Sequence, residues 1–158
     1  MRRWWLITAL LVGSGIMAWL AGCTSGPKEL RFRSEYEAGV GEKVRQALID
    51  FSNAYNLHNV EGIVLLFSEN GQIVSEGKTG VFPREQFFRV HFPEAFKEAF
   101  KKYPSMKLGR PYAFIVLPSR DKAVMEAVAA FGDIELRMKA SMRLEGDQWL
   151  IVKILFWN

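Results

Sequence analysis

The sequence predicts an α+β domain in which helices are followed by a long antiparallel meander of strands. Apolar residues in the first half of residues 41–158 recur at intervals of three and four, as on one face of a helix. From Ile134 to Leu144 apolar and polar residues alternate strictly, which is typical of a strand with one buried face. The chain has 158 residues, of which 49% are hydrophobic and 13% are aromatic, enough for one domain with a substantial core.

Residues 1–22 have the pattern of an export signal. Arg2 and Arg3 precede an uncharged run from Trp4 to Leu20, and small residues follow it. The alternative is a retained transmembrane helix with a buried free cysteine. Its 17 uncharged residues are short for a span, which usually needs about 20. Glycines also interrupt the run, so the export signal is the favoured interpretation.

The end of this segment, Leu20-Ala21-Gly22-Cys23, resembles the lipobox of bacterial lipoproteins. In that family the cysteine becomes the first residue after cleavage and carries the lipid. The resemblance implies an acylated Cys23, and two or more acyl chains anchor a protein firmly to a membrane. Thr24 follows where an Asp often signals inner-membrane retention. The expected location is therefore the cell envelope, on the periplasmic side of the outer membrane if the cell is Gram-negative.

Composition and charge exclude several classes of partner. The single cysteine excludes an internal disulfide and a multi-cysteine metal site. With only His58 and His91 as histidines, we expect no metal and no cofactor. Without Arg2 and Arg3, 19 basic residues face 17 acidic ones, and no block of five Lys or Arg exists. Nucleic acid is therefore not an expected partner.

The elements of the first half follow from local signals. Residues 24–40 are expected to be a tether, of which 29–37 can be helical, and residues 41–158 the folded domain. A first helix is predicted over 41–57. Asn59 can cap a second helix over 60–67. A turn over 68–71 and a strand over 72–76 come next, and residues 78–82 can pair back with that strand.

A third helix is predicted from Pro83, because proline suits the first turn of a helix. Phenylalanines then repeat at intervals of four from Phe88 to Phe100. Pro93 lies inside this run, so the helix must kink or break near His91 and Phe92. Pro104 ends it.

Four strands are predicted in the last third, over 111–117, 123–131, 134–144 and 148–157. The two-residue turn Gly132-Asp133 fixes the register of the middle pair. The resulting pairs are Phe131 with Ile134, Ala129 with Leu136, Ala127 with Met138, Met125 with Ala140, and Glu126 with Lys139. Buried residues thus meet buried residues, and Glu126 forms a cross-strand ion pair rather than a buried base.

The order of these elements resembles the nuclear-transport-factor-2-like superfamily. The matching stretches are residues 51–59 with 66–70, Gly80 with residues 84–88, and the final Gly146-x-x-Trp149-x-Ile151. The resemblance implies a curved antiparallel sheet wrapped around the N-terminal helices as a cone, with a pocket inside. The superfamily contains isomerases, dehydratases and polyketide cyclases, and also non-catalytic binding domains. Asn59 stands where many relatives carry Asp, which argues against carboxylate chemistry there.

Tyr55, His58 and Lys153 are the candidates for catalysis. Tyr55 ends the apolar stripe of the first helix, where some catalytic relatives use a tyrosine as a donor. The residues themselves favour a core tyrosine with its hydroxyl at the rim. His58 is expected at the end of that helix, where a cation suits the dipole. Neither His58 nor His91 has a neighbouring nucleophile. Pocket candidates are Phe51, Tyr55, Phe88, Phe92 and Lys153.

The face on which Lys153 lies depends on the last turn. If Gly146-Asp147 is a two-residue turn, Lys153 shares the buried face with Trp149 and Ile151 and opposes Ala140. A three-residue loop reverses this, and Lys153 is then in solvent. A buried lysine needs a partner, because an isolated buried charge is very costly. Both alternatives stay open.

The expected function is that of a membrane-anchored lipoprotein whose domain binds a small apolar ligand or a partner protein in the envelope. The alternative is a small isomerase- or dehydratase-like enzyme that uses an internal pocket. Many relatives form dimers through the open sheet face. The charges on the alternating strand, Glu135, Arg137, Lys139 and Arg143, neither require nor forbid a homodimer here.

Overall fold

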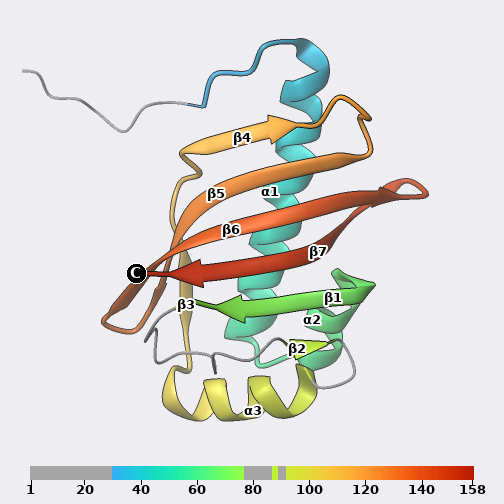
Figure 1. Ribbon diagram of the computed structural model, residues 1–158. Coiled ribbons are helices and arrows are strands. Elements are labelled where there is room, and N and C mark those ends of the chain that lie inside the picture. Colours follow the sequence, from blue (N-terminus) through green and yellow to red (C-terminus); the bar gives the residue numbers. More distant parts are fainter. Residues whose placement is uncertain (1–29, 77–86, 89–91) are drawn as a thin grey trace, which may run out of the picture.

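The structure is a computed structural model that describes residues 30–76, 87–88 and 92–158 (Figure 1). The elements, in chain order, are α1 (Glu35–Asn56), α2 (Val60–Leu65), β1 (Phe67–Ser75), β2 (Phe87–Phe88), α3 (Phe92–Lys102), β3 (Met106–Leu108), β4 (Ala113–Val116), β5 (Lys122–Phe131), β6 (Ile134–Glu145) and β7 (Gln148–Trp157). The strands form one curved sheet in the order β2-β1-β7-β6-β5-β3, and β4 also pairs with β5. Helix α1 packs across one face of this sheet (Figure 1). Helices α2 and α3 lie near the C-terminal end of α1. The predicted α+β class is confirmed.

Helix α1 begins at Glu35, six residues before the predicted start. The Ser34 hydroxyl accepts a hydrogen bond from the backbone N–H of Glu37 at 3.2 Å, which caps the helix. Glu35 and Glu37 lie in the first turn, where negative charge suits the helix dipole. The first turn of the helix therefore lies within the segment expected to be a tether.

The chain just before α1 also packs on the domain. The ring of Phe32 meets that of Phe114 on β4 edge-on, with centroids 5.7 Å apart. Gly41 on α1 leaves room for this ring, because a side-chain carbon there would collide with Phe32. The packed unit thus reaches back to Phe32, within the range 24–40.

The segment after α1 partly follows the prediction. The Asn59 side chain accepts a hydrogen bond from the N–H of Gly62 at 2.9 Å, which confirms the cap of α2. The predicted turn over 68–71 is wrong, because these residues belong to β1. Strand β1 runs parallel to β7, and its register shifts between Phe67 and Gln72. The extra residues are taken up as an irregularity within the strand rather than as a turn.

The third helix is shorter than predicted. Phe88 lies in β2, opposite Gln72 of β1, and not in a helix. Helix α3 begins at Phe92 with Pro93 as its second residue, in the first turn where proline is tolerated. The predicted break near Phe92 is therefore correct. The predicted pairing strand over 78–82, residues 83–86 and His91 lie outside the described residues.

The register of the β5–β6 hairpin is confirmed at all five predicted pairs. Lys139 Nζ lies 3.4 Å from Glu126 Oε1, so the predicted cross-strand ion pair is also confirmed. Besides the β1–β2 pairing, two further features of the sheet were not predicted. The short strand β3 pairs with the end of β5, and β1 runs parallel to β7, so the sheet is mixed rather than wholly antiparallel.

A β-bulge near the middle of β7 decides which side chains point inward. Glu145 pairs with Gln148 across the two-residue turn, and Trp149 and Ile151 are buried. The register shifts between Ser141 and Met142 of β6, and from there on Ile154 and Phe156 are the buried residues. The extra residue reverses the alternation of β7 halfway along the strand.

Candidate functional site

The interior beside α1 is packed with aromatic side chains around Tyr55. The Tyr55 ring is fully buried and meets the rings of Phe100 and Phe131 edge-on, at centroid distances of 4.9 and 5.4 Å. Its hydroxyl donates a hydrogen bond to the backbone carbonyl of Tyr103 at 2.8 Å. Burial raises the pKa of this hydroxyl far above its usual range, and Tyr103 adds to the effect. Tyr55 therefore has the geometry of a core tyrosine whose donor is already in use.

Phe51 is likewise fully buried, between Phe67 and Phe96, with ring centroids 6.0 and 6.3 Å away. The backbone of Phe88 lies in β2 and that of Phe92 at the start of α3, while their side chains lie outside the described part. The two pocket candidates with described rings, Phe51 and Tyr55, thus pack against other aromatic residues.

His58 lies in the turn between α1 and α2, with a left-handed backbone at φ 53°. Its ring stacks on Phe100 at a centroid distance of 4.5 Å, and Nε2 lies 2.9 Å from the carbonyl oxygen of Pro104. These contacts join the end of α1 to the segment that follows α3. His58 and Tyr55 both contact Phe100, but each ring has its own backbone carbonyl as partner.

Lys153 lies on the opposite side of the sheet from Tyr55. Its cross-strand partners are Ser141 of β6 and Gln72 of β1, and all three are half-buried. The turn is the two-residue one, yet the bulge moves Lys153 from the face of Ile151 to the other face. The structure thus separates Lys153 from Tyr55 and His58. Cys23 lies outside the described residues.

The described residues contain neither a metal-binding cluster nor a membrane-spanning helix. No group of three or more His, Cys, Asp or Glu side chains in residues 30–76, 87–88 and 92–158 is arranged to hold a metal ion. In the same ranges, no helix has the length and apolar character needed to cross a bilayer.

The face of the sheet turned away from α1 is called here the outer face. Its residues alternate with the buried ones along β4 to β7, and it carries Ile115, Val124, Glu126, Val128, Arg137, Lys139, Lys153, Leu155 and Trp157. Among the described elements, no helix lies over it (Figure 1). Ile115 is 49% exposed, and the other apolar members are half-buried. The outer face is thus a mixed apolar and charged surface open to a partner.

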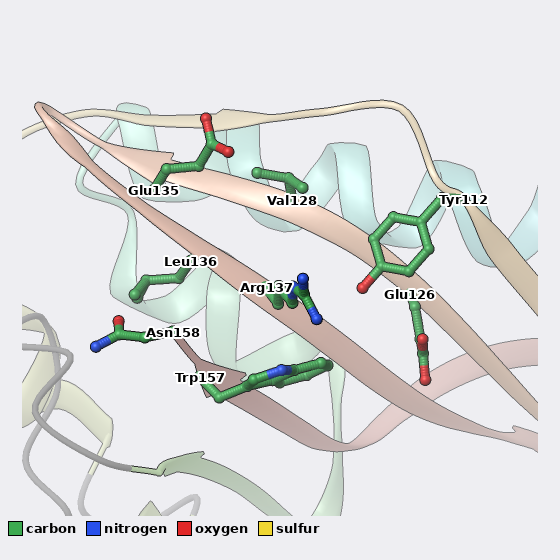
Figure 2. Close-up of a pocket in the computed structure, with 8 residues that line it drawn as sticks. All are labelled: Tyr112, Glu126, Val128, Glu135, Leu136, Arg137, Trp157 and Asn158. Atoms are coloured by element: carbon green, nitrogen blue, oxygen red, sulfur yellow. The ribbon is translucent and has the colours of Figure 1, made fainter. Parts of the chain in front are cut away.

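A groove of about 640 Å³ lies on the outer face (Figure 2). It is lined by Tyr112, Glu126, Val128, Glu135, Leu136, Arg137, Trp157 and Asn158. The rings of Tyr112 and Trp157 lie on either side of the Arg137 guanidinium (Figure 2). Glu135 lies at the end of the groove away from Tyr112. This volume is within the range of about 300–1,000 Å³ that is common for small-molecule sites. We call it the Tyr112–Trp157 groove.

Local structure holds the groove residues in place. The N–H of Tyr112 donates a hydrogen bond to the carbonyl of Glu126 at 2.9 Å, which fixes Tyr112 just before β4. Arg137 lies between Val128 and Trp157, its cross-strand partners on β5 and β7. Burial raises the pKa of the Tyr112 hydroxyl, as does the nearby Glu126 carboxylate, while Arg137 acts in the opposite direction.

The groove was not foreseen from the sequence, although strict alternation already placed Glu126, Val128 and Arg137 on one face. What the sequence did not indicate is that Trp157 lies on the outer face. Continuing the turn register of Glu145 with Gln148 would pair Trp157 with Leu136, on the buried face. The bulge in β7 shifts the partner of Trp157 to Arg137 and turns the indole outward.

Comparison with known proteins supports the fold. No family model matches the chain, and no curated protein matches it. Solved structures do match. A protein from Pseudomonas putida described as NTF2-like and of unknown function superposes with a TM-score of 0.60 at 14% identity, covering 76% of this chain and 87% of its own. A cystatin-like protein of unknown function from Nostoc punctiforme gives 0.58 at 12% identity, covering 74% and 89%.

A putative scytalone dehydratase from Novosphingobium aromaticivorans is similar to the same degree. Its TM-score is 0.59 at 10% identity, and the match covers 77% of this chain and 85% of that one. At these identities the likeness establishes the fold alone. The expected nuclear-transport-factor-2-like fold is therefore confirmed, although the curved sheet around the helices is mixed and not antiparallel throughout.

Proposed function

We propose that this chain is a lipid-anchored protein of the bacterial cell envelope whose domain is a binding module for a small ligand or a partner protein. The observation that carries the binding role is the Tyr112–Trp157 groove, where two aromatic side chains flank an arginine on an open sheet face. Concave sites that combine apolar walls with a few polar groups are the usual form of a ligand site. The interior supports this choice, since the Tyr55 donor is already bonded to the Tyr103 carbonyl.

The anchor rests on the pattern Leu20-Ala21-Gly22-Cys23 after an uncharged run. Acylation of Cys23 would hold the domain at the membrane, with Thr24 favouring the outer membrane of a Gram-negative cell. The expected partners are therefore the membrane and whatever occupies the outer face, a second copy of the chain included.

The enzymatic alternative has less support. One structural relative is a putative scytalone dehydratase, but a shared fold does not carry an activity with it. The three catalytic candidates of this chain do not converge, because Lys153 lies on the outer face, whereas Tyr55 and His58 meet at Phe100 on the side of α1.

The anchor is tested by the intact mass of protein purified from membranes. We expect a chain that begins at Cys23 and carries acyl groups, and a Cys23→Ser variant that lacks them and leaves the membrane fraction. A mass that includes residues 1–22 without acyl groups would contradict the anchor and favour a retained span.

The binding role is tested by native mass spectrometry of the same protein in mild detergent. We expect an additional bound mass that is retained in Leu57→Ala, a control at a residue 78% exposed and distant from the outer face, and lost in Trp157→Ala. A doubled mass would identify a second copy as the occupant. A bare single chain in every sample would contradict the binding module.

A further inference from the structure

We propose that the Tyr112–Trp157 groove binds a small monocarboxylate with a flat apolar body, whose carboxylate contacts Arg137 and the Tyr112 hydroxyl. The inference rests on the proposed binding function of this groove and names the chemistry of its ligand. The groove supplies a cation, a second hydrogen-bond donor and apolar walls, and its two carboxylates are Glu135 and Glu126, of which Glu126 is paired with Lys139.

The cation is Arg137, an exposed residue of β6. Arg143 lies on the same face of the same strand and holds Glu145 at 2.6 Å. Arg137, in contrast, forms no ion pair with any other residue in the described ranges. A guanidinium offers parallel N–H donors that match the two oxygens of a carboxylate. Arg137 is therefore placed to take an anion that the described part of the chain does not provide.

The second donor is the Tyr112 hydroxyl. Figure 2 shows its oxygen turned toward the Arg137 guanidinium across the groove. Because burial and Glu126 raise the pKa of this hydroxyl, it stays protonated at neutral pH and can donate a hydrogen bond. The nearby Glu126 carboxylate is balanced by Lys139 at 3.4 Å, so it opposes an incoming anion less than a free carboxylate would.

The apolar part of the ligand has surfaces to cover. The rings of Tyr112 and Trp157 flank the arginine, and Val128 lies beside it on β5 (Figure 2). Aromatic rings favour stacked or edge-on contact with another ring. A flat ring system carrying a carboxylate would cover both walls while its charge meets Arg137.

Glu135 restricts the choice to a single negative charge. It lies two residues before Arg137 on the same face of β6, which places the two backbones about 7 Å apart. Glu135 has no ion pair with another residue of the described part. A second carboxylate at that end of the ligand would meet a like charge, so the groove should prefer a monocarboxylate to a dicarboxylate.

The test is calorimetric titration of the full chain, purified from membranes in mild detergent, with three naphthalene probes. These are 2-naphthoate, the neutral 2-naphthamide and 2,6-naphthalenedicarboxylate. We expect 2-naphthoate to bind at least about 10-fold more tightly than 2-naphthamide, since a charge-assisted pair is worth at least that factor. It should also bind more tightly than the dicarboxylate, whose second charge meets Glu135. Titration of each probe into the detergent solution without protein is the blank for uptake of the probe by detergent.

Matched variants locate the binding. Arg137→Gln should weaken 2-naphthoate binding by about 10-fold or more, and Tyr112→Phe by about 3- to 10-fold. Arg143→Gln, on the same strand and face but outside the groove, should bind as the wild type does. Arg137 and Arg143 are both exposed, so a comparison of these two variants does not depend on folding.

Three results would overturn the inference: no binding of 2-naphthoate up to millimolar concentration, equal affinity in Arg137→Gln, or a dicarboxylate that binds as tightly. If the mass that depends on Trp157 is nevertheless present, the binding module stands with a different occupant. A bound species of protein mass at the groove would also overturn the small-carboxylate inference while leaving the proposed function intact.

Discussion

At the scale of single residues, Tyr55 combines a buried ring with a buried donor. The ring is enclosed by Phe96, Phe100 and Phe131, and the hydroxyl is bonded to the carbonyl of Tyr103. Ionisation would place a charge among aromatic side chains and break that bond. The fold thus holds the phenol in its neutral form.

This enclosure predicts a dependence of stability on alkaline pH. The folded pKa of Tyr55 lies above the unfolded value of about 10, so its contribution is complete below pH 10 and is lost as the pH rises toward the folded pKa. The free energy of unfolding should fall in that window by up to about 1.4 kcal/mol per pH unit from this group. Urea unfolding between pH 9 and 11 measures it.

The variant Tyr55→Phe should lack this part of the slope and lose about 1 kcal/mol at neutral pH, since the Tyr103 carbonyl is left without its donor. Tyr36→Phe, at a tyrosine that is 45% exposed, is the control for the substitution itself. Parallel pH profiles for Tyr55→Phe and the wild type would contradict this account of Tyr55.

At the scale of elements, the bulge in β7 is what sequence pattern could not supply. A turn residue pair marks the β5–β6 hairpin, and its register was predictable to the residue. No sequence signal indicates the bulge between Ile151 and Ile154, because the pattern of apolar and polar residues allows Val152 and Lys153 on either face of the strand. Both alternatives for Lys153 were therefore half right: the turn was the short one, and the lysine is nevertheless on the outer face.

Because of the bulge, Lys153 lies on the outer face and its neighbour Ile154 is buried. Position 153 should therefore tolerate substitution, whereas position 154 should not. Lys153→Met should change the free energy of unfolding by less than about 0.5 kcal/mol, as is usual for substitutions outside the core. Ile154→Lys should cost more than about 3 kcal/mol, because it places a charge in the core without a partner. Chemical unfolding of the two variants and of Ile154→Met gives the comparison. Tolerance of Ile154→Lys would show that the register is different.

The junction of Phe32, Gly41 and Phe114 allows a sharper test, since the effect of one substitution on stability should depend on whether Phe32 is present. Alanine is favoured over glycine in a helix by about 1 kcal/mol. In the wild type Gly41→Ala should not yield this gain, because its methyl group displaces the Phe32 ring from Phe114. In a Phe32→Ala background the same substitution should stabilise the protein.

The neighbouring Gly39 provides the control for this cycle. A side-chain carbon at Gly39 meets no atom within 4 Å, so Gly39→Ala should stabilise the protein equally with and without Phe32. The coupling is measured by thermal or urea unfolding of Gly41→Ala and Gly39→Ala, each in the wild type and in the Phe32→Ala background. A gain from Gly41→Ala in the presence of Phe32 would mean that Phe32 does not pack against Gly41.

At the scale of the whole molecule, the order of helices and the C-terminal meander could be predicted, while the pairing of distant segments could not. Strand β1 meets β7 in parallel, about eighty residues later in the chain, and β3 pairs with the end of β5. No turn connects these strands directly, so no local signal fixes their register. The groove was missed for a different reason, because the bulge in β7 turns Trp157 outward beside Arg137.

The docking of Phe32 on Phe114 has a consequence for how the protein would stand on a bilayer. Nine peptide bonds separate Cys23 from Phe32, so the chain between them can span at most about 32 Å. Helix α1, of 22 residues and about 33 Å, leads from that point to α3. A lipid at Cys23 would therefore be attached close to β4, at the end of α1 that is opposite α3. The groove residue Tyr112 directly precedes β4, so a lipid anchor would keep the groove within reach of the membrane surface and of ligands that diffuse along it.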